Sequence, residues 1–252
     1  MIQIKTDLHV HSIFTDHAYS TIQENVTYAK SKGIELIAIT DHFGPMFISE
    51  PRLGLFHFIN QTILPNEIDG VRVFKGVEMD IVDHKGNLAF MNERYSETDE
   101  FSVGERVLKS AEFVIASVHM NPVFQPSTKV RHTEMYINAI RNPYVNMIGH
   151  IGRSGMEFEI NEVLRVAKQE NKIIEINNHS FRKDPENLIC RKIAERCAEF
   201  EIPIAVNSDA HFSQYIGNYE YAIDMLEEIH FPEELIVNRT KESILEYMKY
   251  AE

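Results

Sequence analysis

Short apolar, β-branched runs alternate along the chain with amphipathic stretches of helical period. In the segment 161–167, apolar residues stand at 163, 164, 166 and 167, which is the spacing of one helix face. The predicted strands are Ile2–Asp7, Ile34–Thr40, Val71–Val77, Phe113–Val118, Val145–Gly149, Lys172–Ile176 and Ile202–Asn207. The predicted helices are Thr21–Lys32, Thr133–Arg141, Asn161–Glu170, Pro185–Glu199, Glu220–Glu228 and Lys241–Tyr250.

This alternation of strands and helices predicts an α/β fold built around a parallel sheet. Seven βα repeats are one fewer than the ideal eight-fold barrel has, so we expect a closed or nearly closed barrel of seven strands. A short eighth candidate strand, Leu235–Val237, is followed by no motif. No low-complexity tract or linker interrupts the chain, which predicts a single domain over residues 1–252.

One long stretch, Phe43–Gly70, shows no clear strand. A loop of this length in a compact domain usually has a function, so we expect it to cover the barrel mouth or to contribute to substrate choice. By contrast, the tyrosines and methionines of Tyr215–Met225 fit the core-facing stripe of a helix.

Composition narrows the class of protein. Of the 252 residues, 44% are hydrophobic and 25% charged, which is typical of a water-soluble globular protein, and no apolar run is long enough to span a membrane. Met1–Asp7 becomes charged too early for a secretory signal, so we expect a cytoplasmic protein. The formal net charge of −13, with no basic cluster, disfavours nucleic acid as a partner. The oligomeric state, including a homo-oligomer, is left open.

The two cysteines, Cys190 and Cys197, fall seven positions apart in one predicted helix. That spacing separates them by roughly 10 Å along the helix axis, which is too far for a disulfide. We expect buried thiols, and any metal must then be bound without sulfur.

Histidines and carboxylates stand at or just after the ends of six predicted strands. Residues at the carboxyl ends of barrel strands point into one shared cavity, where barrel active sites lie. The residues in these positions are His9, His11, His17, His42, Glu78, His119, His150, Asp209 and His211.

Two pairs in this set have a spacing suited to chelation. His9 and His11, like Asp209 and His211, are two residues apart, so both side chains of a pair face the same side of an extended backbone. Imidazole suits Zn, Mn and Fe, and a carboxylate can bridge two ions. Nine ligands exceed the number that one catalytic ion takes, which predicts more than one divalent transition-metal ion.

A structural alternative exists for each motif, because an isolated His-x-His or Asp-His is often a polar pair without metal. Six strand ends that each supply such a residue are harder to explain by packing, since every buried His or Asp would need its own partner. The combined pattern therefore favours a metal site.

These motifs resemble the PHP superfamily, named for polymerase and histidinol phosphatase, and more specifically its YcdX-type metal-dependent phosphatases. The resemblance covers nearly the whole chain. It rests on Asp7-Leu8-His9-Val10-His11-Ser12, His57-Phe58-Ile59-Asn60, Gly76-Val77-Glu78, Pro122-Val123-Phe124, Glu175-Ile176-Asn177-Asn178 and Ser208-Asp209-Ala210-His211. One difference is Gly149-His150-Ile151-Gly152-Arg153, where relatives tend to have Gly-His-Pro-Gly.

The resemblance implies a distorted seven-stranded, TIM-like (β/α)7 barrel with a trinuclear metal site. By position, the first ion would be held by His9, His11, Glu78 and Asp209. A second ion would share Glu78 and add His119 and His150. A third would take His17, His42 and His211.

The implied reaction is hydrolysis of small phosphomonoesters by a hydroxide that bridges two metals. Glu78 and Asp209 are the predicted catalytic residues; the leaving group would be protonated by metal-bound water or by Asp209. Arg153 and Arg182 follow predicted strands and could clamp phosphate, and Asn178 and His179 could face the substrate or support the ligands. Asp7 and Asp41 adjoin ligands and could accept their second imidazole N–H.

Four other readings stay open at this point. A histidinol-phosphate phosphatase would share the fold and chemistry but have a dedicated biosynthetic substrate, and a PHP-type nuclease is disfavoured by the acidic charge. A binuclear amidohydrolase often needs a lysine after the fourth strand, where this chain has Ser117-Val118-His119. A non-enzymatic metal-binding protein would bind metal without turning over a phosphomonoester.

Overall fold

Seven parallel strands form the frame of the molecule in the computed structural model, which describes residues 1–119, 127–182, 184 and 187–250. They are hydrogen-bonded in the order β1-β2-β5-β6-β7-β8-β9. Their bounds are β1 Thr6–Val10, β2 Leu36–Ile39, β5 Val71–Asp80, β6 Phe113–Ser117, β7 Met147–Ile148, β8 Ile173–Asn177 and β9 Ile204–Asn207. Two short strands lie beside β5: β3 (His42–Phe43) runs parallel to it and β4 (Glu67–Ile68) antiparallel.

The sheet curves until its first and last strands meet. Val10 and Ala210 form a parallel bridge just past the ends of β1 and β9. The His11 amide donates to the Ala210 carbonyl at 2.9 Å, and the Ala210 amide donates to the His9 carbonyl at 3.3 Å. The nearly closed seven-stranded α/β barrel expected from the sequence is thus confirmed.

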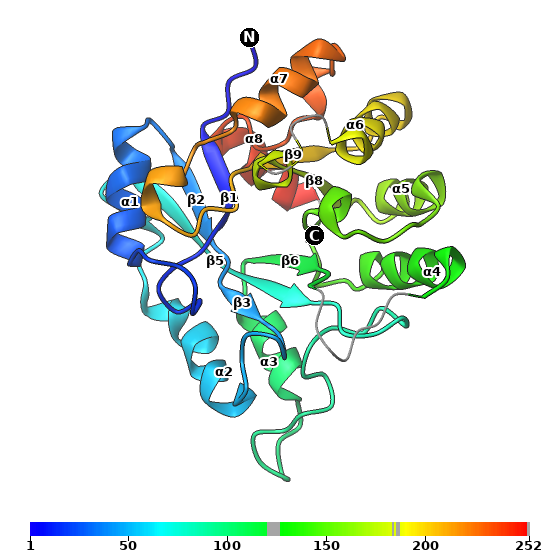
Figure 1. The fold of residues 1–252 in the computed structure, drawn as a ribbon. Helices are drawn as coiled ribbons and strands as arrows, with labels where there is room; N and C mark the ends of the chain where they lie inside the picture. Colours follow the sequence, from blue (N-terminus) through cyan, green and yellow to red (C-terminus); the bar gives the residue numbers. More distant parts are fainter. Residues whose placement is uncertain (120–126, 183, 185–186, 251–252) are drawn as a thin grey trace.

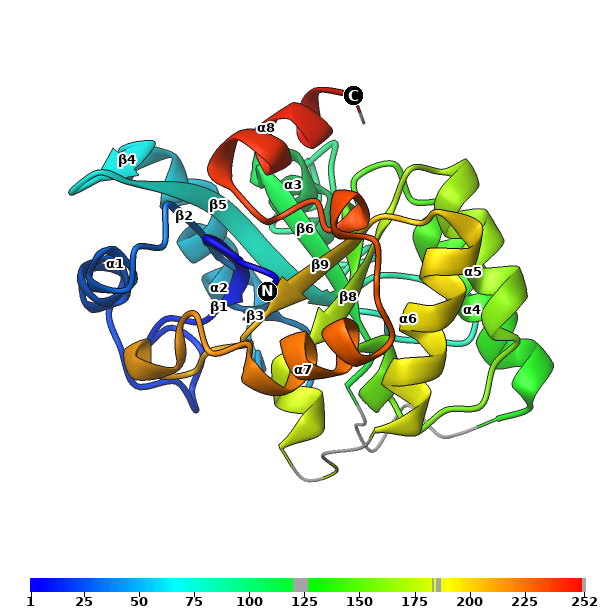
Figure 2. The same cartoon turned by 90° about the horizontal axis from the view of Figure 1, so that it is seen from above.

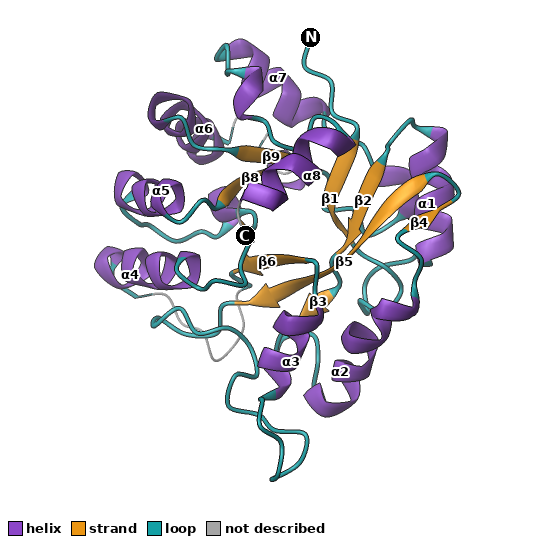
Figure 3. Cartoon of the chain, turned by 180° about the vertical axis from the view of Figure 1, so that it is seen from behind, coloured by secondary structure: helices purple, strands orange, loops and turns teal. Residues whose placement is uncertain are grey.

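Helices surround the strands on the outside, as Figures 1 and 3 show. They are α1 Ile22–Ser31, α2 Pro51–Ile59, α3 Val103–Ser110, α4 Lys129–Ile140, α5 Ile160–Gln169, α6 Leu188–Phe200, α7 Glu220–Glu228 and α8 Lys241–Tyr250. Helix α1 begins with a capping box between Thr21 and Glu24, which satisfies amides of its first turn. The predicted cysteine pair lies on α6, where both thiols are buried and free.

Helix α8 covers the end of the barrel opposite the strand carboxyl ends (Figures 2 and 3). Its Ile244 is fully buried with residues that fill the barrel interior, such as Leu8, Phe113 and Met147. The Tyr247 hydroxyl donates to the carbonyl of Asn171, just before β8, at 2.8 Å. Because α8 covers this end, only the other end of the barrel, where the carboxyl ends of the strands lie, is left as a mouth.

The structure corrects several element predictions. Phe43–Gly70 is not a loop: it contains α2, a 3-10 turn at Asn60–Ile63 and β4, and the density of apolar residues in α2 hid its helical period. Leu235–Val237 is not a strand: Leu235 ends a 3-10 turn that spans Glu233–Leu235, and Ile236 forms a single bridge with Ile204. Helix α3 was not predicted. The Pro122-Val123-Phe124 motif and Pro185 lie outside the described residues.

The described helices include none long and apolar enough to cross a membrane.

Candidate metal centre

Every one of the nine predicted ligand positions lies at the carboxyl-end mouth of the barrel. His9 lies within β1, His11 follows it, His42 is in β3 and Glu78 is in β5. His119, His150, Asp209 and His211 follow β6, β7 and β9, and His17 lies on the segment after β1. Residues as far apart in the sequence as His9 and His211 therefore meet in one place.

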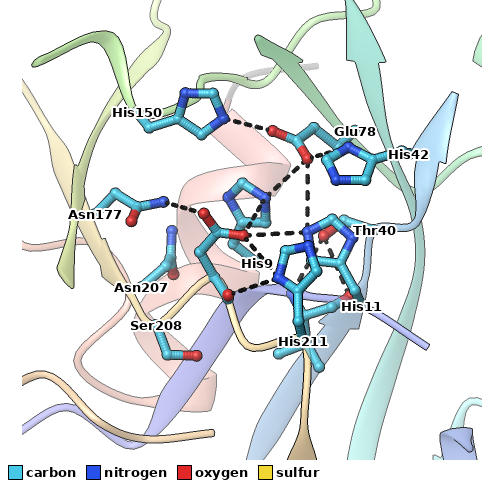
Figure 4. Close-up of polar contacts among 12 residues, drawn as sticks. His9, His11, Thr40, His42, Glu78, His150, Asn177, Asn207, Ser208 and His211 are labelled. Carbon is cyan, nitrogen blue, oxygen red and sulfur yellow. Dashed lines mark hydrogen bonds and ion pairs between the residues drawn. The ribbon is translucent and has the colours of Figure 1, made fainter. Parts of the chain in front are cut away.

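Glu78 is in close contact with several histidines of the group (Figure 4). Its Oε2 lies 3.2 Å from Nε2 of His9 and 2.8 Å from Nδ1 of His42. Its Oε1 lies 2.9 Å from Nε2 of His150 and 3.6 Å from Nε2 of His119. One fully buried carboxylate thus faces imidazoles from four elements, which is the position of a bridging ligand.

Ligand atoms cluster tightly enough for metal ions. Three overlapping groups have all their candidate atoms within 4.8 Å of one another. The groups are His9, His11 and Asp209; His11, His42 and His211; and His42, Glu78 and His119. Their overlap is the pattern expected for neighbouring ions that share ligands.

The outer side of the cluster is open to solvent. The His17 ring lies 4.5 Å from that of His211 and 5.2 Å from that of His42, and 46% of its side chain is exposed. The Phe47 ring stacks on His42 at 3.9 Å. The segment after β3 therefore borders the site, as expected for Phe43–Gly70.

Several buried atoms at the centre make no hydrogen bond among the described residues, although most of them lie at ion-pair distance from a carboxylate or an imidazole of the cluster. They are Nε2 of His9, His11 and His211, Nδ1 of His42 and Oε2 of Glu78. Unpaired buried polar atoms are costly, and in native proteins they call for a missing ion or water. Five such atoms that converge, all nitrogen or carboxylate oxygen, fit divalent transition metals.

The carboxylates that support the imidazoles differ from those predicted. Nδ1 of His9 lies 2.8 Å from Glu175, and Nδ1 of His119 lies 2.8 Å from Asp80. Each could orient its ring for metal binding through the other nitrogen. Asp80 follows Glu78 by two residues on the same strand face, and this period-two signal could have identified it.

Asp7 and Asp41, predicted for that role, have other partners. Asp7 accepts hydrogen bonds from the amide and hydroxyl of Ser208, at 3.1 and 2.5 Å. Asp41 accepts hydrogen bonds from Ser12 and Thr15, and lies 3.0 Å from Nε2 of His57. Both carboxylates therefore fix the backbone that carries the ligands, and the prediction that they bind ligand imidazoles was wrong.

Opposing effects set the charge states of the two β1 histidines. Burial would lower the pKa of His9, but the negative charges of Glu78, Glu175 and Asp209 raise it well above its usual value. For His11, burial together with His42 and His211 lowers the pKa well below that value. The neighbouring imidazoles of His9 and His11 thus differ in charge in the metal-free protein.

The two carboxylates of the cluster stay ionised. Burial raises the pKa of Glu78, but His9 and His42 outweigh it, so the net shift is well below the usual range. For Asp209, His9 and Arg153 likewise outweigh burial and lower the pKa well below its usual value. Two negatively charged carboxylates in a buried site favour the binding of cations there.

Backbone strain coincides with two of these residues. His150 has φ +26° and Asp209 has φ +56°, in the left-handed region that residues other than glycine rarely occupy. Such conformations cost about 1–3 kcal/mol and persist where the surroundings demand them, often at functional sites. Here they turn the side chains into the mouth.

A pocket of about 670 Å³ opens over the cluster. Arg153, Asn178, His179 and Arg182, proposed from the sequence as substrate or supporting residues, all line it. The Arg153 Nη2 donates to Oδ2 of Asp209 at 2.7 Å, whereas its Nη1 is buried without a partner among the described residues. Oδ1 of Asn178 accepts from the Ala222 amide at 3.0 Å, so that oxygen is already engaged.

The expectation of a core-facing stripe in Tyr215–Met225 is only partly correct. Ala222 and Met225 are buried, but Tyr215 and Tyr221 are 49% and 45% exposed and line the same pocket.

Comparison with protein families and known proteins agrees with this geometry. The PHP domain profile matches residues 7–179, and a PHP-associated profile matches residues 188–244. A probable phosphatase of Caldanaerobacter subterraneus subsp. tengcongensis is 40% identical over 98% of this chain and 92% of its own length. Another, from Acetivibrio thermocellus, is 39% identical over 96% of this chain and 94% of its own.

Two solved structures share the fold at low identity. One is a histidinol phosphate phosphatase of Lactococcus lactis, complexed with zinc, L-histidinol and phosphate. Its TM-score is 0.63 and its identity 23%, with 90% of this chain and 94% of the other covered. The other is a Xaa-Pro dipeptidase with a TM-score of 0.55 and 14% identity, covering 99% of this chain and 76% of its own.

Proposed function

The chain belongs to the PHP family, and we propose that it hydrolyses small phosphomonoesters at a site for two or three divalent transition metals. The observation that carries the proposal is the convergence of buried histidine nitrogens and carboxylate oxygens beneath an open pocket, five of which make no hydrogen bond among the described residues. Full-length relatives named probable phosphatases support the reaction class.

The residues that would hold the metals are the nine at the barrel mouth: His9, His11, His17, His42, Glu78, His119, His150, Asp209 and His211. Glu78 would be shared, because its two oxygens face different sets of imidazoles. When bound, Zn, Mn or Fe ions would neutralise phosphate charge and lower the pKa of a water nucleophile to about 7.

In the net reaction, water adds across the P–O bond: phosphorus keeps the hydroxyl and the leaving oxygen takes the proton. Asp209 is poorly suited to donate that proton, because its pKa lies well below the usual range. We assign to Asp209 and Glu78 the role of holding the metal cations beside the reacting phosphate. The leaving group then takes its proton from solvent-accessible groups of the pocket.

Arg153 would bind the phosphate. Its guanidinium is fixed at Nη2 by Asp209, and the side chain, which is 32% exposed, lines the pocket. A guanidinium anchored in this way loses little freedom when it binds phosphate, which favours specific recognition.

A chromogenic phosphomonoester assay with Zn, Mn or Fe tests the function. The wild-type chain should turn over, and His9→Ala and His11→Ala should each abolish turnover. The exposed His230, changed to Asn, serves as a matched control that should keep wild-type rates. Wild-type rates in both active-site variants would exclude the proposed site.

Two further measurements separate the rival functions. Bound metal without turnover of any phosphomonoester would favour a metal-binding protein that is not an enzyme. Complementation of a histidine auxotroph that lacks its histidinol-phosphate phosphatase would identify that dedicated activity.

A further inference from the structure

Four exposed aromatic side chains, which we name the aromatic wall, line the pocket above the metal centre. They are Tyr19, Phe212, Tyr215 and Tyr221, whose exposed fractions are 73%, 37%, 49% and 45%. Single exposed aromatics are common on protein surfaces, but four in one concave site mark a ligand-binding surface.

Two residues of this wall, Phe212 and Tyr19, are bonded to His211 of the candidate metal centre, one through the chain and one through a hydrogen bond. Phe212 follows His211 in the chain, and the Tyr19 amide donates to the His211 carbonyl at 2.8 Å. The rings of Phe212 and Tyr215 are 6.4 Å apart at 70°. A substrate whose phosphate lies against the histidines would thus place its leaving group beside these rings.

The charges of the pocket restrict that leaving group. Arg153 and Arg182 both line it, and the Arg182 guanidinium lies 5.9 Å from the centre of the Tyr215 ring. Among the described lining residues, Asp209 is the only carboxylate, and it already pairs with Arg153. A cationic leaving group would therefore meet two guanidiniums and no free carboxylate.

We propose that the aromatic wall is the leaving-group subsite and selects phosphomonoesters of flat, aromatic alcohols that carry no positive charge. This inference rests on the proposed phosphatase function and adds the substrate class to it. Tyrosine rings recognise such groups by stacking or edge-to-face contact, which is typically worth a factor of about 2 to 12 per ring pair.

A matched substrate pair tests the aromatic part with the metal-loaded full chain. Benzyl phosphate and cyclohexylmethyl phosphate differ in the planarity of the ring, and kcat/KM should be higher for benzyl phosphate. Tyr215→Ala and Tyr221→Ala should each lower the ratio of the two constants about threefold to tenfold. Tyr215→Phe and Tyr221→Phe keep the ring and should hold the ratio within about twofold.

Tyr144 provides a control, because it is similarly exposed, at 39%, and does not line the pocket. Tyr144→Ala should leave the ratio unchanged. An unchanged ratio in both pocket alanine variants would overturn the aromatic subsite. If the wild-type chain turns over the chromogenic phosphomonoester but neither of these esters, the aromatic subsite fails. If it turns over no phosphomonoester, the proposed function fails instead.

The charge restriction has its own pair: phosphocholine and its uncharged isostere 3,3-dimethylbutyl phosphate. The isostere should have the higher kcat/KM, and Arg182→Gln should reduce this preference. Equal or better hydrolysis of phosphocholine would overturn the restriction, because the tyrosines would then act as a cage for cations.

Discussion

Glu175 Oε1 lies 2.8 Å from Nδ1 of His9, and both side chains are fully buried. The other Glu175 oxygen accepts from the His150 amide at 2.6 Å and from the Asn177 side chain at 3.0 Å. Glu175 thus links two predicted ligands from different strands. Burial raises its pKa, but His9 outweighs this effect and keeps the pKa below its usual value, so the carboxylate is charged.

Glu175→Gln should weaken metal binding without removing a ligand. The neutral amide no longer supports the basicity and orientation of His9, and losses of such partners cost about 10- to 100-fold in affinity. Titration against a chelating dye measures this. Glu201→Gln changes the same residue type in an exposed ion pair with Lys168 and should have no effect. Equal affinities in the two variants would mean that Glu175 does not tune the site.

His57→Asn should destabilise the fold. His57 Nε2 lies 3.0 Å from the buried Asp41 carboxylate, and the imidazole stacks on Phe14 at 3.6 Å. Asparagine is too short to keep both contacts, and a buried charge that loses a partner costs about 1–3 kcal/mol. Urea unfolding measures the change, with His230→Asn as the exposed histidine control. A stability equal to that of the control would contradict a structural role for the Asp41–His57 pair.

The barrel and the convergence of the nine candidate ligand residues at its mouth could be predicted because both follow from local patterns. Strand alternation placed His and carboxylate residues at strand ends, and parallel strands bring those ends to one mouth. The supporting carboxylates were missed because their partners come from other elements: Asp80 faces His119 and Glu175 faces His9. Closeness in sequence suggested Asp7 and Asp41 instead. Asp41 directly precedes His42, and adjacent residues of an extended backbone face opposite sides. Asp7 lies two positions before His9, but its carboxylate accepts hydrogen bonds from the remote Ser208, which no local pattern reveals.

Two other features could not be predicted from periodicity. The nine residues of α2 carry apolar residues on several sides, so no single stripe marks them as a helix. Tyr215 and Tyr221 share a sequence segment with the buried Ala222 and Met225. Their exposure depends on the pocket that the remote strand ends create, which no local pattern encodes.

Metal affinity should rise with pH through the neutral range. A metal ligand must be a neutral imidazole, and in the metal-free protein acidic neighbours outweigh burial and raise the pKa of both His9 and His119 above 6.5. Protons therefore compete with metal at these two residues near pH 7, and binding should release protons. His150 and His211, whose pKa values burial helps to lower to about 4, begin to compete only in stronger acid.

Competition with a chelator at pH 8, 7, 6 and 5 measures this dependence. Affinity should fall at each step, and metal should be released toward about pH 5. Elemental analysis at pH 8 should find more than one transition metal per chain. Constant occupancy between pH 8 and 5 would rule out imidazole ligation at His9 and His119.

Arg153→Lys should separate phosphate recognition from metal binding. Lysine keeps a positive charge near Asp209 but has no planar fork, so it cannot hold Asp209 and also offer phosphate a second donor from the same fixed group. We expect KM for a phosphomonoester and the inhibition constant of inorganic phosphate each to rise about tenfold, the loss of one charged hydrogen bond. Metal content should remain that of the wild type.

The exposed Arg141, changed to Lys, controls for the substitution itself. If the phosphate inhibition constant stays at its wild-type value in Arg153→Lys, then Arg153 serves only to hold Asp209, and phosphate is bound by the metals alone.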